Sequence, residues 1–593
     1  METGNELSPS RKLKRFLPAL LPPLLAFLVF SPSITSGFSL WDDQVQIVLN
    51  PFVRSHLPLP RQLLNLFRRD VSSFVTVRGT GNYYRPFMQL AYWAEYRLWG
   101  LTGWAFHLVS LLLNSLVAFL AFLVLKELLA GRRPRESEAS ATAWAACAGA
   151  TLFAVHPLHA EPVAWLAALP ELQFSASYLL ALWLYLRGIG GPGRRRGFWI
   201  LQIAGAALLA YLCKEMAVTL PLVVGMHLCL GARWPWNRRA ILLRCSLLAP
   251  FVLMAISYFG IRQWALGGRL GLGRPEVASW KPTLLSALTL CGRYWAKIVF
   301  PYPLSLAYPF RPTDSLAEPF LWLGLATVVA AVWLFLKRFR LAAMGILWVG
   351  VTLLPALNIR NVGDELPIAD RYAYLPSLGL SVLVAAACLR VVRLSPKIRW
   401  GFAGVFAVLL LFFAGLSGVR AQQWNNQIEL YSQAVERAPA YWLYTVWGNT
   451  LLAEERWEES LVPFRKALEV GRGRTVRSDA HNGMSFAYFK MGNLDRAKGE
   501  LERALLINPD SQYARYNLAL VHRQLGDLAE AMNEVKVSLR LNPYSIEANL
   551  LAGQIAQAQG DRETARRYFA ITLRLDPNNA EARQGFRDVF KQP

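Results

Sequence analysis

Two adjacent carboxylates, Asp42 and Asp43, follow the first long apolar run of the chain, in the stretch FSLWDDQVQIVLNPF. A carboxylate at a membrane face can remove the proton of a hydroxyl group within its reach, or it can hold that hydroxyl or a metal ion. The alternative is a solvated acidic turn with no chemical role. Spacing alone favours the turn, so the catalytic interpretation needs support from the rest of the chain.

Arg85 lies in the stretch NYYRPF, where Pro86 fixes the backbone beside it and Tyr83 and Tyr84 precede it. A guanidinium group presents paired N–H donors that suit a phosphate or a carboxylate. An interfacial aromatic belt with one snorkelling arginine has the same composition and is the simpler interpretation.

Two further cations, Lys214 and Arg371, lie in short segments that are otherwise poor in positive charge. A lipid phosphate is a natural partner for such side chains. The alternative is an internal ion pair between sequence neighbours, Lys214 with Glu215 and Arg371 with Asp370. The sequence does not decide between the two.

The segment HPLHAE brings together His156, His159 and Glu161, which invites a metal-site interpretation. This spacing is not an established strong zinc pattern, and Pro157 disturbs the helical geometry that would turn the side chains to one face. We expect histidines that make structural hydrogen bonds, and we predict no metal site here. The six cysteines form no CxxC pair, so a disulfide scaffold or a structural zinc site is not expected.

The elements that carry these residues are mostly apolar. The chain has 593 residues, of which 54% are hydrophobic and 17% charged, whereas about 25% charged residues is usual for a soluble domain. This composition excludes a single water-soluble globule and a disordered chain. The formal net charge is +24, and nearly all of the excess lies in residues 1–419. A basic excess within the apolar part indicates membrane orientation rather than nucleic-acid binding.

Eleven apolar runs have approximately the length of a membrane-spanning helix. With the N-terminus inside, the basic loops fall on the inner side, provided that residues 283–300 do not cross. The first run lacks a cleavage-site pattern, so we expect a retained helix. The C-terminal region then lies outside, together with two long loops, 36–103 and 261–316. The runs are 16–35, 104–126, 141–159, 171–187, 197–213, 216–231, 240–260, 317–336, 341–358, 375–393 and 400–419.

The last third of the chain repeats every 34 residues. Asn508-Pro509, Asn542-Pro543 and Asp576-Pro577 recur at this period, as do Gly492, Gly526 and Gly560, and Ala497, Ala531 and Ala565. A 34-residue period with these small residues and a terminal proline is typical of tetratricopeptide repeats. We predict about four repeats over 441–593, a joining helix over 420–440, and a concave face of the solenoid that suits a peptide.

The motifs WDD…NP, YYRP, HLVSLLLN, LFAVHPLHAEPVAW, CKEMAVTLP and ADRYAYLPSLG follow one another along the chain. In this order they resemble the transmembrane and tetratricopeptide-repeat (TMTC-like) O-mannosyltransferases of the GT-C superfamily, over nearly the whole chain. The stretch GDELPIADRYAYLPSLG looks most like the bacterial members.

The resemblance implies an enzyme that takes a sugar from a polyprenyl-phosphate carrier and transfers it to an acceptor on the outer face, with inversion. An Asp of the first outer loop acts on the acceptor hydroxyl in such enzymes. It maps onto Asp42, with Asp43 as its neighbour and the other possibility. We nominate Arg371 and Lys214, with Arg85 as a lesser candidate, to hold the leaving phosphate. The expected supporting residues are His156, His159, Glu161, Glu171, Glu215, Asp370 and Tyr374.

One segment departs from the family pattern. Members usually carry G-R-x-D shortly after the HPxHxE motif, but the arginine position here is Leu169 and the acid is Glu171. A missing cation could change the donor sugar or abolish activity, although Glu171 could still serve as the acid. It favours a rival interpretation, a degenerate transferase whose solenoid organises an envelope protein complex. A lipid or sugar transporter would show internal repeats in the membrane half, and none are visible.

We therefore predict an all-α chain with a GT-C-like membrane domain of about 11 transmembrane helices over 1–419, followed by the solenoid. The predicted function is sugar transfer, mannose first, from a polyprenyl-phosphate carrier to a protein Ser or Thr hydroxyl. No cofactor is required in this interpretation, and a divalent cation is left open. The expected partners are the lipid-linked sugar and an acceptor polypeptide, not nucleic acid. We expect the bacterial inner membrane, with the N-terminus cytoplasmic and the repeats periplasmic, or the endoplasmic reticulum membrane in a eukaryote.

Overall fold

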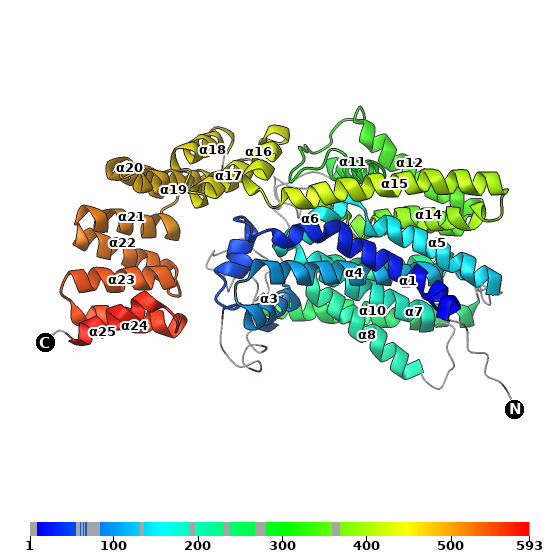
Figure 1. Ribbon diagram of the computed structural model, residues 1–593, viewed down its shortest axis with the longest axis horizontal. Coiled ribbons are helices and arrows are strands. Elements are labelled where there is room, and N and C mark those ends of the chain that lie inside the picture. Colours follow the sequence, from blue (N-terminus) through cyan, green and yellow to red (C-terminus); the bar gives the residue numbers. More distant parts are fainter. Residues whose placement is uncertain are drawn as a thin grey trace. The chain divides into compact units, whose positions relative to one another are not determined.

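The computed structural model describes residues 9–54, 60, 63, 66–67, 84–130, 136–188, 196–230, 237–266, 280–357, 368–471 and 473–591. The described residues form helices and no strand, which confirms the all-α expectation. They divide into two compact units, with the division between Asn425 and Asn426 (Figure 1). Parts of the two long loops expected over 36–103 and 261–316 lie outside the described residues.

The first unit is a bundle of long apolar helices. Helices α1, α4, α5, α7 and α14 pack side by side around one large hydrophobic core (Figure 1). The helices of this unit are α1 (Pro9–Phe30), α3 (Pro86–Trp99), α4 (Gly103–Leu129), α5 (Glu136–Ala154), α6 (Ala160–Ala164), α7 (Leu169–Gly188), α8 (Arg196–Cys213), α9 (Leu220–Leu230), α10 (Arg238–Ala265), α11 (Trp280–Val299), α12 (Pro319–Leu336), α13 (Arg340–Leu353), α14 (Leu378–Val391) and α15 (Pro396–Gln423).

Six of the described helices are long and apolar enough to cross a membrane, and a seventh span results if α5 and its continuation, bent by 53°, count as one. Helices α8, α9 and α13 are apolar but shorter. Each of the eleven apolar runs of the sequence overlaps a helix of the first unit, although several run past the helix ends or across a break. Helix α11, which was expected not to cross, is not among the described helices with the length and composition of a span. It packs closely on α12 because Gly292 and Gly324 face each other, and a Cβ at Gly292 would lie 2.0 Å from the Phe320 carbonyl oxygen.

Short helical turns interrupt the bundle where the candidate residues lie. The chain bends after α5, close to Pro157, and it continues through the turn η4 (Pro157–His159), α6 and the turn η5 (Leu166–Ala168). The turns η2 (Gln44–Val48), η7 (Glu215–Thr219) and η8 (Asp370–Ala373) lie at or next to most of the other candidates, whereas Arg85 precedes α3 and Glu171 lies in α7. A turn between long helices can project side chains that the regular helices would bury in apolar surroundings.

The second unit is a stack of helix pairs, which confirms the tetratricopeptide expectation (Figure 1). Gly492, Gly526 and Gly560 adopt φ of +76°, +88° and +80° at the turn inside three of the pairs, a conformation that glycine adopts at low cost. The repeating alanines are fully buried where paired helices meet. The pairs are α17 (Tyr441–Ala453) with α18 (Trp457–Val470), α19 (Arg474–Lys490) with α20 (Leu494–Ile507), α21 (Gln512–Leu525) with α22 (Leu528–Leu541) and α23 (Ile546–Ala558) with α24 (Arg562–Leu575).

The segment expected as a joining helix over 420–440 is divided between the two units. Helix α15 continues to Gln423, and a separate helix α16 (Gln427–Arg437) packs on α17 of the repeat stack. Helix α25 (Ala580–Lys591) packs on α24 at the other end of the stack.

Candidate active site

Asp43 is a buried residue that connects the segment after α1 to the turn η5. One carboxylate oxygen accepts the Ser39 backbone N–H and the other accepts the Ala167 backbone N–H, each at 2.7 Å. The neighbouring Trp41 ring stacks on Trp165 with a centroid distance of 4.4 Å and an interplanar angle of 7°. Burial raises the pKa of Asp43 to about 7, although its two backbone hydrogen bonds act in the opposite direction. Both oxygens of Asp43 are therefore occupied by the protein itself.

Asp42 has the opposite character. Its side chain is partly buried, and it makes no hydrogen bond or ion pair with any residue that the structure describes. Burial raises the pKa of Asp42, and the positive charges of Arg371 and Arg85 partly counter this effect. A carboxylate with a raised pKa suits proton removal, because its basicity is increased, and no residue in the described part of the chain competes for the oxygens of Asp42.

Arg371 projects from the turn η8 against α6. Its guanidinium Nη1 lies 2.5 Å from Glu161 Oε1, and its backbone N–H donates to Glu161 Oε2 at 3.1 Å. The guanidinium also lies 5.1 Å from the centroid of the Trp165 ring, so the same tryptophan contacts Trp41 and Arg371. This arrangement connects Arg371 to the segment that carries Asp42.

Lys214 forms a buried ion pair with Glu171 of α7, and both side chains are at most 5% exposed. Its ammonium group also lies near the rings of Phe174 and Tyr372. The carboxylates adjacent in sequence, which were the alternative partners of Lys214 and Arg371, are not the ones that bind them. The true partners are on other helices, 43 and 210 residues away.

Arg85, at the start of α3, makes a two-point contact with Glu215. The distances are 3.1 Å from Nε to Oε2 and 2.5 Å from Nη2 to Oε1. Each of the three cations expected to hold a phosphate thus has a dedicated glutamate. A phosphate at this site must share a cation with a carboxylate or displace it.

The two histidines of the HPLHAE segment make structural hydrogen bonds. His156 Nδ1 accepts the Leu158 N–H at 3.3 Å, so its Nε2 carries the proton and donates to the Ile298 carbonyl oxygen at 2.9 Å. His159 Nε2 lies 3.0 Å from Ser377 Oγ. Among the described residues, no group of three or more His, Cys, Asp or Glu side chains could hold a metal ion.

Tyr374 and Asp370 stabilise the same turn from two sides. The Tyr374 hydroxyl donates to Asn114 Oδ1 of α4 at 2.7 Å. The Tyr308 hydroxyl lies 2.8 and 3.0 Å from the two Asp370 oxygens, and Lys297 Nζ lies 3.4 Å from Oδ1. Sequence reasoning did not nominate Lys297 or Tyr308, because both lie more than 60 residues from Asp370. The one available signal was a lysine within a mostly apolar segment.

The departure from the family pattern has a structural counterpart. Leu169, at the position where an arginine is usual, is buried in an apolar cluster with Tyr92 and Phe106. Glu171, the acid of this segment, is buried as the ion-pair partner of Lys214. The missing cation is therefore replaced by hydrophobic packing, while the acid keeps a charged partner.

With this geometry established, known proteins can be compared. A family model described as "Tetratricopeptide repeat" matches residues 487–546. "Protein O-mannosyl-transferase Tmtc3" of Drosophila melanogaster is 26% identical over 537 residues, which cover 79% of this chain and 56% of the fly protein. "Protein O-mannosyl-transferase TMTC4" of Mus musculus is 26% identical over 490 residues, covering 72% of this chain and 64% of the mouse protein. The chain is similar to the TMTC O-mannosyl-transferases over most of its length.

The resemblance found in the motifs is thus confirmed, and the expected bacterial origin stays a prediction. The chain spans about half the length of the fly relative. Among solved structures, a thermophilic tetratricopeptide protein of Thermus thermophilus aligns with 32% of this chain and 95% of its own, at 18% identity and a TM-score of 0.25.

Proposed function

We propose that this chain is a membrane glycosyltransferase that moves a sugar, mannose first, from a polyprenyl-phosphate carrier to a protein Ser or Thr hydroxyl. The observation that carries the proposal is the contrast between the two aspartates. Asp43 is bound on both oxygens, whereas Asp42 has no hydrogen-bond partner among the described residues and is subject to the positive charge of Arg371. The relatives support the reaction class, since each is named a protein O-mannosyl-transferase.

The proposed reaction is a single displacement. The acceptor oxygen attacks the anomeric carbon of the donor while Asp42 takes the hydroxyl proton. The bond between the anomeric carbon and the phosphate oxygen breaks, the configuration inverts, and polyprenyl phosphate leaves with the bonding electrons. Cations stabilise the charge that develops on this phosphate. Asp43 does not react in this scheme and instead positions the Asp42 segment against η5.

The division of roles is supported by the charges around Asp42. Arg371 is attracted by both Glu161 and Asp42 before reaction. When Asp42 accepts the proton it becomes neutral, so more of the positive charge of Arg371 is available to the leaving phosphate. Proton transfer and phosphate stabilisation are then coupled through one guanidinium group.

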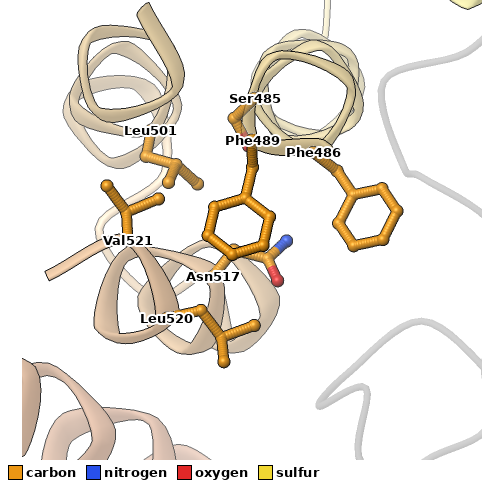
Figure 2. A pocket seen from close by; sticks show the side chains of 7 residues that line it. All are labelled: Ser485, Phe486, Phe489, Leu501, Asn517, Leu520 and Val521. Carbon is orange, nitrogen blue, oxygen red and sulfur yellow. The ribbon is translucent and has the colours of Figure 1, made fainter. Parts of the chain in front are cut away.

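We assign acceptor binding to the repeat stack. A hollow between α19, α20 and α21 is lined by Ser485, Phe486, Phe489, Leu501, Asn517, Leu520 and Val521 (Figure 2). Asn517 donates to Asn482 Oδ1 at 2.9 Å, so side-chain amides of two successive repeats lie together on the first helices of their pairs. Amides bind a peptide backbone and the aromatic rings offer an apolar contact, which suits an extended polypeptide. The basic-loop pattern supports a periplasmic position for these repeats in a bacterial inner membrane.

A catalytically degenerate scaffold is the second candidate, and the burial of Leu169 in place of a cation is the observation that favours it. Sugar transfer in liposomes that contain the full chain tests the two against each other. A panel of labelled polyprenyl-phosphate sugars is offered with an acceptor extract, and the Asp42→Asn variant is the negative control. Label in protein that depends on Asp42 supports the enzyme. No transfer from any donor, with intact capture of acceptor polypeptides by the repeats, would favour the scaffold.

A further inference from the structure

The cations around the turn η8 differ in how tightly carboxylates hold them. Arg371 and Arg85 each have a carboxylate oxygen 2.5 Å away, and Lys214 has a still closer carboxylate contact. Lys297 of α11 is the exception among these four. Its ammonium nitrogen is 3.4 Å from Asp370 Oδ1 and 3.5 Å from the Pro303 carbonyl oxygen, both beyond the usual length of an N–H···O hydrogen bond.

Asp370 makes only a long contact with Lys297, and its closer partner is the Tyr308 hydroxyl. Both of its oxygens are within 3.0 Å of the Tyr308 hydroxyl. Lys297 lies over the ring of the same tyrosine, 3.5 Å from its centroid, and this contact holds the ammonium group without using its N–H donors in a short hydrogen bond. The side chain is 15% exposed, so a ligand has access to it.

The pairings of these cations also differ in how easily a second anion can compete. The pairs Lys214–Glu171 and Arg85–Glu215 have short contacts between oppositely charged groups. Lys297 lies 3.4 Å from its carboxylate partner, Asp370. A phosphate that approaches Lys297 therefore competes with a weaker carboxylate contact than one that approaches Lys214 or Arg85.

We propose that Lys297, together with Arg371, binds the phosphate group of the lipid-linked donor, and that Lys214 and Arg85 serve mainly to hold the surrounding helices. This inference rests on the proposed function and changes which residues perform one part of it. Lys297 faces Asp370, which directly precedes Arg371 in the turn η8, so one phosphate at this turn can approach both cations. Arg371 also acts electrostatically on Asp42, which supports a phosphate position close to the residue that takes the acceptor proton.

A binding experiment separates this assignment from a purely structural ion pair. Labelled polyprenyl phosphate without a sugar is titrated into the detergent-solubilised full chain. Lys297→Gln removes the charge but keeps a group that can donate to Asp370, and we expect about tenfold to a hundredfold weaker binding. Lys297→Arg should retain most of the affinity. Lys281→Gln, an exposed lysine at the start of the same helix, is the matched control and should bind like the wild type.

Asp370→Asn gives the decisive contrast. It removes the carboxylate that competes with a phosphate for Lys297, so binding should stay equal or become tighter. If Lys297 matters only as a partner of Asp370, both variants should lose affinity together. Equal loss in Asp370→Asn and Lys297→Gln, or wild-type affinity in Lys297→Gln, would overturn the assignment. If Lys297→Gln does not elute as a folded protein, the direction of the Asp370→Asn effect alone decides.

Two further arms distinguish the ligand. A short-chain polyprenyl phosphate should displace the label, whereas equimolar inorganic phosphate should not, and equal displacement by both would overturn a site for the lipid-linked group. If the wild type binds no polyprenyl phosphate, the donor class of the proposed function is wrong. If the wild type binds it and Lys297→Gln binds equally well, only the role of Lys297 is wrong.

Discussion

Replacing each of the two adjacent aspartates by asparagine should separate catalysis from stability. Asp42→Asn removes the base but disturbs no hydrogen bond with a described residue. Loss of a general base lowers a rate by about 10²- to 10⁴-fold. A substitution that breaks no contact usually changes the free energy of unfolding by no more than about 0.5 kcal/mol. We therefore expect a folded variant with almost no sugar transfer.

Asp43→Asn should show the reverse pattern. An asparagine has one acceptor oxygen where the aspartate uses two, so the N–H of Ser39 or of Ala167 loses its buried acceptor and meets an amide donor. An unsatisfied buried donor costs about 1–3 kcal/mol. Burial raises the pKa of Asp43 to about 7, which means that the buried negative charge is unfavourable. Its removal in the asparagine variant offsets part of this cost. We expect a lower melting temperature and a partial loss of transfer.

The assay combines two measurements on each variant in the same detergent: transfer from labelled polyprenyl-phosphate mannose and the apparent melting temperature. Asp314→Asn, which changes an exposed carboxylate in the loop between α11 and α12, is the control and should match the wild type in both measurements. The reasoning is refuted if Asp42→Asn transfers sugar at nearly the wild-type rate. It is also refuted if Asp43→Asn is the inactive variant while its melting temperature is unchanged.

Three other predictions follow from buried charge and backbone geometry. The pKa of Asp43 is higher in the folded than in the unfolded chain, so between about pH 4 and 7 the native state keeps a proton that the unfolded chain releases. The melting temperature should therefore fall as the pH rises through this window, and it should fall less in Asp43→Asn. Glu171→Gln leaves Lys214 as a buried unpaired charge and should destabilise the first unit by about 3–5 kcal/mol. The double variant Glu171→Gln with Lys214→Met should recover part of this loss, and a double variant less stable than Glu171→Gln would contradict the buried ion pair. Gly526→Ala places a methyl group on a residue with φ +88°, where the space around it is free, so only backbone strain is expected. The free energy of unfolding of the repeat stack should fall by about 1–2 kcal/mol, measured from the loss of helix content in denaturant, and no measurable loss would contradict the left-handed turn.

The proposed mechanism assigns unequal roles to residues of the same type. Lys214 and Lys297 are both lysines near η8, yet one is enclosed by a carboxylate and two aromatic rings while the other makes only long polar contacts. Substitution of Lys214 should therefore appear mainly as a loss of stability. Substitution of Lys297 should appear mainly as weaker donor binding.

Periodic features of the chain were predictable from the sequence. The apolar runs identified most of the long helices of the first unit, because a long helix in an apolar environment needs only a continuous hydrophobic segment, but they did not include α3 or α11. The 34-residue period identified the repeat stack, since each repeat buries the same small residues and turns at the same glycine. The motifs around Asp42, His156 and Arg371 also indicated a resemblance to the TMTC O-mannosyl-transferases, and the similarity to those proteins over most of the chain confirms this resemblance.

The tertiary structure alone decided which side chains pair. The sequence offered Lys214 with Glu215 and Arg371 with Asp370, but the partners are Glu171 and Glu161 on other helices. Adjacent residues in a turn point in different directions, and their partners depend on which helices pack against that turn. The contrast between Asp42 and Asp43 has the same origin, because the second acceptor bond of Asp43 comes from Ala167, 124 residues away. Local sequence patterns determine local conformation. Contacts between distant segments determine which charged side chains are paired with a protein group and which are available to a substrate.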